Sequence, residues 1–205
     1  MYIAIEGIKG SGKSTIINEW LPYTKSQSMD VGCFPITAPM TVWHPMECQY
    51  RYNLQLQNDD DFTEQLFINR AYWNQPTEKF ATLIGDRSIV TAIVSRWQKW
   101  DDPYQTISKV KEDYKDIMKP DVIILIETPV ENALINIASR TPKLTGKRDE
   151  SRQQLQSAHE VYQELILDGL YSRQLGITDI IRLPYTPDID SIQKEIFSIF
   201  KFYHQ

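Results

Sequence analysis

Short apolar runs alternate with amphipathic stretches along the whole chain, and five of the runs have the length and composition of strands. The run at Asp121–Ile126 is apolar after its first residue, which indicates a strand buried on both faces of a sheet. The other four predicted strands are Tyr2–Glu6, Asp30–Ile36, Thr82–Gly85 and Ile177–Leu183.

The amphipathic stretches between these runs predict helices. The first is expected from residue 13 to about Trp20, because Pro22 lacks a backbone donor. The segment 45–78 is expected to form two helices, with Asp61 as the N-cap of the second. Further helices are predicted at 88–100, 104–118, 129–139, 151–170 and 189–202.

Strands that alternate with helices imply a parallel sheet covered by helices on both faces. The sequence contains no repeat, low-complexity tract or flexible linker. Residues 1–205 are therefore predicted to form a single α/β domain around a five-stranded parallel sheet.

The turn after the first predicted strand carries the strongest chemical signal in the chain. Residues 7–14 read Gly-Ile-Lys-Gly-Ser-Gly-Lys-Ser, which matches the phosphate-binding pattern G-x-x-x-x-G-K-[ST] in full. Glycines let backbone amides curl around phosphate oxygens, and the following helix N-terminus adds a positive field. The predicted ATP-binding residues are Gly7, Gly10, Ser11, Gly12, Lys13, Ser14 and Thr15.

Two side chains of this loop have specific expected roles. Lys13 is expected to reach the β- and γ-phosphates, and the Ser14 hydroxyl is expected to ligate Mg²⁺. The loop therefore predicts a nucleoside triphosphate, ATP, bound together with Mg²⁺ as cofactor. It does not define the phosphate acceptor.

A second candidate site follows the third predicted strand. Asp86 and Arg87 stand at its carboxyl end, the edge where open parallel sheets bind ligands. Asp86 is expected to hold Mg²⁺ or to accept a proton, and Arg87 is expected to clamp a phosphate or the reacting oxygen. A helix cap with a surface salt bridge is the alternative interpretation.

Charge and composition exclude several classes of function. The 205 residues include 27 acidic and 22 basic side chains, and this net charge of −5 argues against non-specific binding to nucleic acid. No apolar run approaches the roughly 20 residues that a membrane span needs. Cys33 and Cys48 are too few for a disulfide framework or a zinc quartet, so we expect a cytoplasmic protein.

Several segments resemble known kinases. Residues 5–15, Ile-Glu-Gly-Ile-Lys-Gly-Ser-Gly-Lys-Ser-Thr, look like the opening of deoxynucleoside kinases. Asp86-Arg87-Ser88 resembles their E-R-S motif, and equally the D-R-Y or D-R-H motif of thymidylate kinases. Residues 38–43, Ala-Pro-Met-Thr-Val-Trp, resemble the E-P-M-x-x-W segment of herpesviral thymidine kinases and the E-P-V-x-x-W segment of cellular deoxynucleoside kinases.

With Lys119 through Arg140, which resembles the strand and helix before the lid, the likeness covers nearly the whole chain. It implies a three-layer P-loop kinase fold, a phosphotransferase of nucleotide salvage or deoxynucleotide synthesis, and a tendency to form homodimers. The expected acceptor is of thymidine or pyrimidine type.

The chain departs from the family at Ala38, where the family's glutamate is the expected general base for a nucleoside 5′-hydroxyl. Such a base contributes about 10²–10⁴-fold. A monophosphate acceptor is already anionic, so Ala38 favours it unless Asp86 is the base. Against this, the chain lacks the R-E-P-G-G segment of thymidylate kinases and has Lys9 where they tend to carry an acid. Both acceptor classes stay open.

The resemblance also implies an acceptor pocket within residues 43–73, which contain seven aromatic residues. A nucleobase needs flat apolar walls and an amide on its hydrogen-bonding edge. Asn69-Arg70-Ala71 resembles the D-R-A of thymidylate kinases. A packed helix pair is the alternative. The expected contacts are Trp43 and Gln65 with the base, Tyr50 or Tyr52 with the sugar, and Arg70 with the acceptor nucleotide.

The polar, basic segment 140–152 is predicted to form a short lid. Phosphoryl transfer spreads negative charge over the transferring group, and a basic lid stabilises that charge while it excludes water. Arg140 and Arg148 stand where the family places lid arginines, although its R-x-R spacing is not reproduced. A solvated basic loop is the alternative.

The favoured hypothesis is phosphoryl transfer from ATP–Mg²⁺ to a deoxynucleoside or its monophosphate. Because Ala38 has no proton acceptor, a nucleotide-binding protein that has lost catalysis and acts as a partner or regulatory subunit is the alternative. A P-loop GTPase is disfavoured, since the chain has no N-K-x-D motif to recognise the base. The expected catalytic residues are Lys13, Asp86, Arg87, Arg140 and Arg148.

Overall fold

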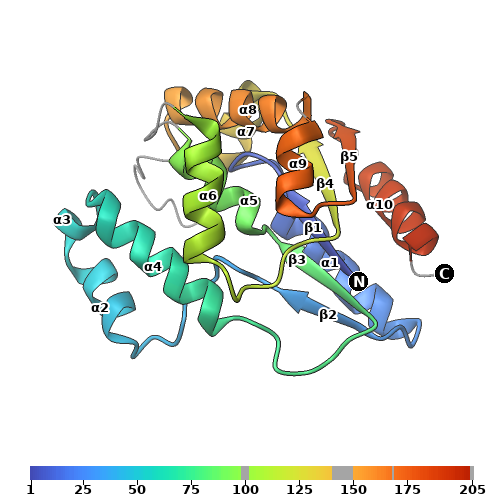
Figure 1. The fold of residues 1–205 in the computed structure, drawn as a ribbon. Helices are drawn as coiled ribbons and strands as arrows, with labels where there is room; N and C mark the ends of the chain where they lie inside the picture. The colour runs from blue at the N-terminus through green and yellow to red at the C-terminus, as the bar shows by residue number, and fades with distance from the viewer. Residues whose placement is uncertain (98–101, 140–149, 168, 204–205) are drawn as a thin grey trace.

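A computed structural model describes residues 1–97, 102–139, 150–167 and 169–203. Five parallel strands form one sheet in the order β2-β3-β1-β4-β5 (Figure 1). This confirms the predicted α/β fold with a five-stranded parallel sheet. The strands are β1 Tyr2–Glu6, β2 Val31–Phe34, β3 Thr82–Asp86, β4 Val122–Glu127 and β5 Asp179–Pro184.

Helices cover both faces of this sheet, as the alternation of strands and helices predicts (Figure 1). Among the helices in the described ranges, none combines the length and the apolar composition that crossing a membrane requires. The helices are α1 Lys13–Ser26, α2 Pro45–Tyr52, α3 Leu54–Gln57, α4 Asp60–Trp73, α5 Ile89–Arg96, α6 Pro103–Asp113, α7 Val130–Ala138, α8 Arg152–Leu167, α9 Gly169–Leu175 and α10 Ile189–Tyr203.

The two faces of the sheet bury two separate cores. Along β1, Ile3 and Ile5 point to the face that α1 and α10 cover, where Trp20 packs edge-on against Phe200 with ring centroids 4.8 Å apart. Tyr2 and Ala4 belong to the opposite core, which α5, α6 and α8 complete. This alternation is the period of two that a strand imposes.

Helix α1 is longer than the sequence predicts. It continues through Pro22 to Ser26, although proline removes one helical donor. Trp20, Ile16 and Ile17 are buried against the sheet on the α1 side, and this packing outweighs the local preference of Pro22. The predicted end near Trp20 is therefore wrong.

Several other boundaries differ from the predictions: β2 is shorter than 30–36, β5 begins at Asp179 and not at Ile177, and α6 ends at Asp113 and not near residue 118. Asp59, and not Asp61, caps α4, because its carboxylate accepts the amide of Phe62 at 2.9 Å. The segment 45–78 forms three helices, and α9 follows α8 as a separate helix. The predicted helix end at Trp100 lies outside the described residues.

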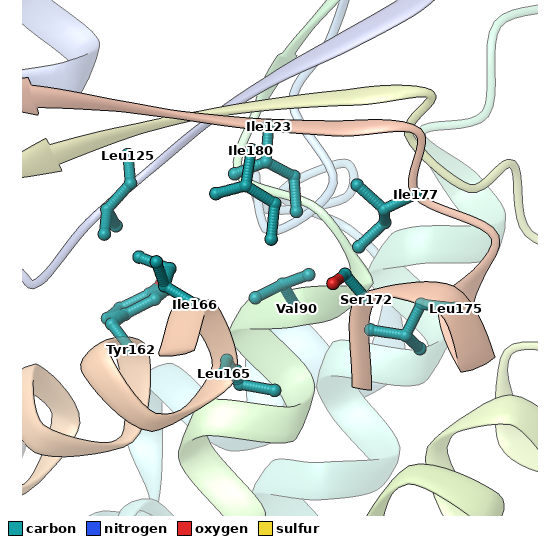
Figure 2. Close-up of a pocket in the computed structure, with 10 residues that line it drawn as sticks. All are labelled: Val90, Ile123, Leu125, Tyr162, Leu165, Ile166, Ser172, Leu175, Ile177 and Ile180. Atoms are coloured by element: carbon teal, nitrogen blue, oxygen red, sulfur yellow. The ribbon is translucent and has the colours of Figure 1, made fainter. Parts of the chain in front are cut away.

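A small apolar cavity lies between the sheet and helices α5, α8 and α9 (Figure 2). Apolar side chains line it together with Ser172 and Tyr162, and Figure 2 shows Val90 on a helix and Ile123 on a strand of the sheet. Its volume of about 20 Å³ has room for about one water molecule. It is a packing defect and not a substrate pocket.

Candidate active site

The carboxyl ends of β1 and β3 place the two sequence motifs side by side. Ile5 is in register with Asp86 across the pair β1–β3, and with Ile124 across β1–β4. The phosphate loop leaves β1 two residues later, so it begins beside the Asp86-Arg87 turn. The structure thus brings the two strongest predicted sites to one edge of the sheet.

The phosphate loop has the backbone that its glycines predict. Gly7, Gly10 and Gly12 all have positive φ angles, of 146°, 86° and 89°. A Cβ at Gly10 would lie 2.5 Å from the carbonyl oxygen of Ala133, so α7 packs directly on the loop. Asn136 of α7 also donates to the Gly10 carbonyl at 2.9 Å. The loop is therefore held in shape from outside as well as by its own glycines.

The Lys13 side chain lies inside this loop. Its ammonium donates to the carbonyl oxygens of Gly7 and Ile8 and to the Ser11 hydroxyl, each at 2.8 Å. These partners are neutral oxygens, and a charged phosphate oxygen is a stronger acceptor for the same donor. The ammonium is thus placed to move onto a phosphate when one enters the loop.

Ser14 and Asp86, the two residues predicted to hold magnesium, lie in contact with each other. The Ser14 hydroxyl donates to Asp86 Oδ2 at 3.1 Å, across 72 positions of sequence. Magnesium takes hard oxygen ligands and is usually held by one or two protein groups plus substrate phosphates. A hydroxyl and a carboxylate beside a phosphate loop fit that requirement.

Arg87 occupies a strained turn. Its φ of 72° lies in the left-handed region, which side chains larger than glycine rarely adopt. Its amide donates to the Ile5 carbonyl at 3.1 Å, and its own carbonyl accepts the Tyr2 hydroxyl at 3.2 Å. Strained backbone persists where the surroundings fix it, and it concentrates at functional sites.

Glu6 is a residue of this site to which the sequence interpretation gave no role. Its fully buried carboxylate accepts both the amide and the hydroxyl of Ser88 at 2.7 Å, and the hydroxyls of Thr91 and Tyr162 at 2.8 Å. The available signal was an acid that ends an apolar strand immediately before a glycine loop. Its partners stand up to 156 positions away, so the sequence could not name them.

A cleft of about 310 Å³ joins these groups. In the described part of the chain, Asp86 is the one carboxylate among the residues that line it. Lys9 also faces the cleft and pairs at 3.0 Å with Glu150, in the described end of the predicted lid 140–152. The lining consists of residues Lys9 to Thr15 with Thr37, Asp86 and Arg87.

The segment predicted to bind the acceptor contains a buried ion pair. Arg70 of α4 donates from Nε and Nη2 to the two carboxylate oxygens of Glu47 in α2, at 2.7 and 2.8 Å. Both residues are buried, and the Met40 amide also donates to Glu47 at 2.9 Å. Arg70 thus ties α4 to α2 and to the loop at residues 37–40, where its Nη1 donates to the Thr37 carbonyl.

The environment of Glu47 favours its charged form. Burial alone would raise the pKa of this carboxyl, but the hydrogen bonds from Arg70 and Met40 and the Arg70 charge outweigh burial. They hold the pKa of Glu47 below its usual value. Glu47 is therefore a partner for Arg70 and a poor proton acceptor.

The structure brings together only part of the predicted acceptor set. Trp43 and Tyr52 are 84% and 86% exposed, and Gln65 is also exposed on α4. The Arg70 guanidinium carbon lies over the Tyr50 ring, 5.5 Å from the centroid of that ring. In the described part of the chain, none of these four side chains lines the cleft. Their role as acceptor contacts therefore stays a prediction.

Of the predicted lid, residues 140–149 lie outside the described ranges, and with them Arg140 and Arg148. The end of the lid segment is described. There, Arg152 forms a two-bond pair with Glu131 at the start of α7. Both side chains are exposed, so this pair contributes little to stability.

Comparison with solved structures agrees with this architecture, whereas the two sequence comparisons find no match. No protein-family profile matches the sequence, and no curated protein matches it. A solved structure of deoxyadenosine kinase from M. mycoides with bound dATP superposes with a TM-score of 0.65 and 16% identity, over 98% of this chain and 100% of that one. The chain has the fold of deoxynucleoside kinases. This confirms the three-layer P-loop kinase fold that the motifs imply.

A second structure of the M. mycoides deoxyadenosine kinase holds dCMP as product and a flexible dCDP. It superposes with a TM-score of 0.60 and 17% identity, over 99% of this chain and 100% of that one. At this identity the similarity shows the fold, and the activity must be argued from the residues of this chain.

Proposed function

We propose that this protein is an ATP-dependent kinase that transfers the γ-phosphate of ATP to the 5′-hydroxyl of a deoxynucleoside. One observation carries the proposal: a complete phosphate loop and the Asp86-Arg87 turn share one cleft at the carboxyl edge of the sheet. The full-length likeness to deoxyadenosine kinase structures supports the same reaction class.

Each group of the cleft has a role in this reaction. The amides of residues 7–14 and the Lys13 ammonium bind the β- and γ-phosphates. Ser14 would hold Mg²⁺ directly and Asp86 would hold it only through water, which leaves the Asp86 carboxylate able to accept a proton; when bound, the metal supplies charge neutralisation at those phosphates. Arg87 donates to the oxygens of the transferring group, where negative charge accumulates.

The Arg70–Glu47 pair favours a nucleoside acceptor over a monophosphate. An acceptor phosphate would need a free cation, whereas two Arg70 donors are already committed to a buried carboxylate. Removing one partner of a buried pair costs about 3–5 kcal/mol. An uncharged nucleoside avoids that cost.

A nucleoside hydroxyl gains from a base, and Ala38 supplies none. We assign that role to Asp86, the carboxylate that lines the cleft. Its carboxylate takes the hydroxyl proton as the new O–P bond forms, while the bond from the γ-phosphorus to the bridging oxygen breaks and ADP leaves. By the resemblance of residues 38–43, we propose a pyrimidine such as thymidine as the acceptor.

The second candidate is a nucleotide-binding subunit without catalysis, and Ala38 is the residue that favours it. Incubation with ATP–Mg²⁺ and the four deoxynucleosides, with ADP release as the readout, separates the two. We expect release with at least one nucleoside, most with a pyrimidine. Absence of release with every nucleoside and every monophosphate would overturn the kinase proposal.

Asp86→Asn tests the assignment of the base. It keeps the size and the Ser14 contact but cannot accept the proton, so we expect kcat to fall by about 10²–10⁴-fold. Asp116→Asn is the matched control, because Asp116 lies outside the cleft and just beyond α6. An Asp86→Asn variant with the wild-type rate would remove Asp86 from the mechanism.

A further inference from the structure

We propose that Glu6, Thr91 and Tyr162 are positioning residues that aim Arg87 at the transferring phosphate. The inference rests on the proposed kinase function and adds to it three residues outside the cleft lining. None of the three was singled out as a site residue by the sequence motifs. They come from β1, α5 and α8, and they meet in the buried layer between the sheet and these helices.

The first step is the state of Glu6. Four donors surround its carboxylate: the Ser88 amide, and the hydroxyls of Ser88, Thr91 and Tyr162, all at 2.7 to 2.8 Å. A buried carboxylate needs such donors, because burial without them is costly. Glu6 is the acceptor for each of the three hydroxyls, and Thr91 Oγ1 also lies 3.4 Å from the Tyr162 hydroxyl, where either atom could be the donor.

The second step connects Glu6 to Arg87. Thr91 Oγ1 gives its proton to Glu6 Oε2 at 2.8 Å and accepts from Arg87 Nη1 at 3.2 Å. The buried negative charge therefore orients the Thr91 lone pairs toward the guanidinium. Thr91 is the link that lets a fully buried acid control the direction of a side chain that lines the cleft.

The third step concerns the backbone. Arg87 has a φ of 72°, and Ser88, the next residue, is bound to Glu6 through both its amide and its hydroxyl. Ser88 in turn caps α5, since its hydroxyl accepts the Val90 amide at 3.2 Å. Glu6 thus fixes the strained turn on one side, while Tyr2 and Ile5 fix it on the other.

The fourth step is Tyr162, which extends from α8 at the wall of the small apolar cavity (Figure 2). Burial first, and then the nearby Glu6 charge, raise the pKa of Tyr162 far above its usual value. The phenol therefore stays a donor at any working pH, and it anchors Glu6 to α8. Helix α8 follows the predicted lid in sequence, so the same network joins the lid-side helix to the Arg87 turn.

Thr91 offers a matched pair of variants. Thr91→Val keeps the shape but removes the hydroxyl, whereas Thr91→Ser keeps the hydroxyl. We expect Thr91→Val to lower kcat by about ten-fold, because the Arg87 guanidinium loses its orientation. The KM for ATP should change by less than about two-fold, because the phosphate loop is intact. Thr91→Ser should restore most of the wild-type kcat.

Tyr162→Phe tests the anchor on α8, and Tyr203→Phe is its control. Tyr203 also donates to a carboxylate, Asp179 at 2.6 Å, but it lies on α10 across the sheet. We expect kcat to fall in Tyr162→Phe and to be unchanged in Tyr203→Phe. Equal effects in the two variants would assign the loss to general destabilisation and contradict the proposal.

Two further readouts separate positioning from stability. In an Arg87→Ala background, Thr91→Val should have almost no further effect on kcat, because its action passes through Arg87. The same factor in both backgrounds would overturn the proposal. The rotation of the Arg87 guanidinium, followed by NMR of its Nη protons, should be slow in the wild type and faster in Thr91→Val.

The NMR measurement does not depend on turnover. If wild-type protein phosphorylates no acceptor but Thr91→Val still frees the Arg87 guanidinium, the kinase function fails and the network stands. If the wild type is active while kcat and guanidinium rotation are unchanged in Thr91→Val, the positioning proposal fails and the kinase function stands.

Discussion

The phosphate loop and the acceptor-side helices hold their charged groups in opposite ways. Lys13 bonds to neutral oxygens of its own loop at the edge of an open cleft. Arg70 is buried and bonds through two donors to the Glu47 carboxylate. A phosphate oxygen is a stronger acceptor than these three oxygens of the loop, whereas an incoming phosphate must displace a carboxylate from Arg70.

This difference shows why similar cations on the two sides are not equivalent as phosphate ligands. In the phosphate loop, the acceptors described for Lys13 are neutral oxygens, and a phosphate is a stronger acceptor than these. On the acceptor side the cation already has a charged partner and acts as a cross-link between α2 and α4. The proposal of an uncharged acceptor follows from this contrast.

The largest expected effect is at Lys13. Lys13→Ala should lower kcat by at least about 10²-fold, because it removes a charge from the site of negative charge build-up. ADP release with the best nucleoside measures it. Lys25→Ala at the exposed end of α1 is the control. A mild effect at Lys13 would mean that the loop does not bind the transferring phosphate.

Arg70 tests the other side of the comparison through stability. Arg70→Met leaves Glu47 as an uncompensated buried charge, so the free energy of unfolding should fall by about 3–5 kcal/mol. The double variant Glu47→Met with Arg70→Met should recover much of that loss. Urea unfolding measures both. If the double variant loses as much unfolding free energy as the two single variants together, Glu47 and Arg70 do not cross-link α2 and α4.

The motifs near the phosphate loop are local, so they could be predicted from the sequence. Residues 7–14 form one contiguous pattern, and Asp86 and Arg87 follow directly from a strand end. The Glu47–Arg70 pair joins residues 23 positions apart on two helices, and Glu6 bonds to Tyr162 across 156 positions. Such pairs depend on the fold. Pro22 shows the same limit, because packing of Trp20 extends a helix that the local sequence would end.

Acid titration tests the charged state of Glu47 in the folded protein. Because its folded pKa lies below its ordinary value of 4.5, its charge stabilises the fold above that pH and this contribution is lost as pH falls through the folded pKa. Glu47→Gln lacks this titration. The difference in unfolding free energy between wild type and Glu47→Gln should therefore be constant above about pH 5 and shrink below pH 4.5. A difference that grows toward acid pH would contradict the assignment.

The smallest expected effect lies outside both regions, at the cavity between the sheet and α5. Val90→Ile adds one methylene beside a void of about 20 Å³ and should stabilise the fold by up to about 0.8 kcal/mol. Val94, on the same helix, is not among the residues that line this cavity. Val94→Ile should therefore be neutral or destabilising. Thermal unfolding compares the two variants. A reversed order would show that the cavity is not a packing defect.

The proposed selection of an uncharged nucleoside depends on Glu47, which occupies Arg70. The most direct test is kcat/KM for the best deoxynucleoside and for its own 5′-monophosphate, measured in wild type and in Glu47→Gln. We expect the wild type to prefer the nucleoside by at least about ten-fold, and Glu47→Gln to narrow that preference because it releases part of the Arg70 charge. A wild type that prefers the monophosphate, or a preference unchanged in Glu47→Gln, would contradict it.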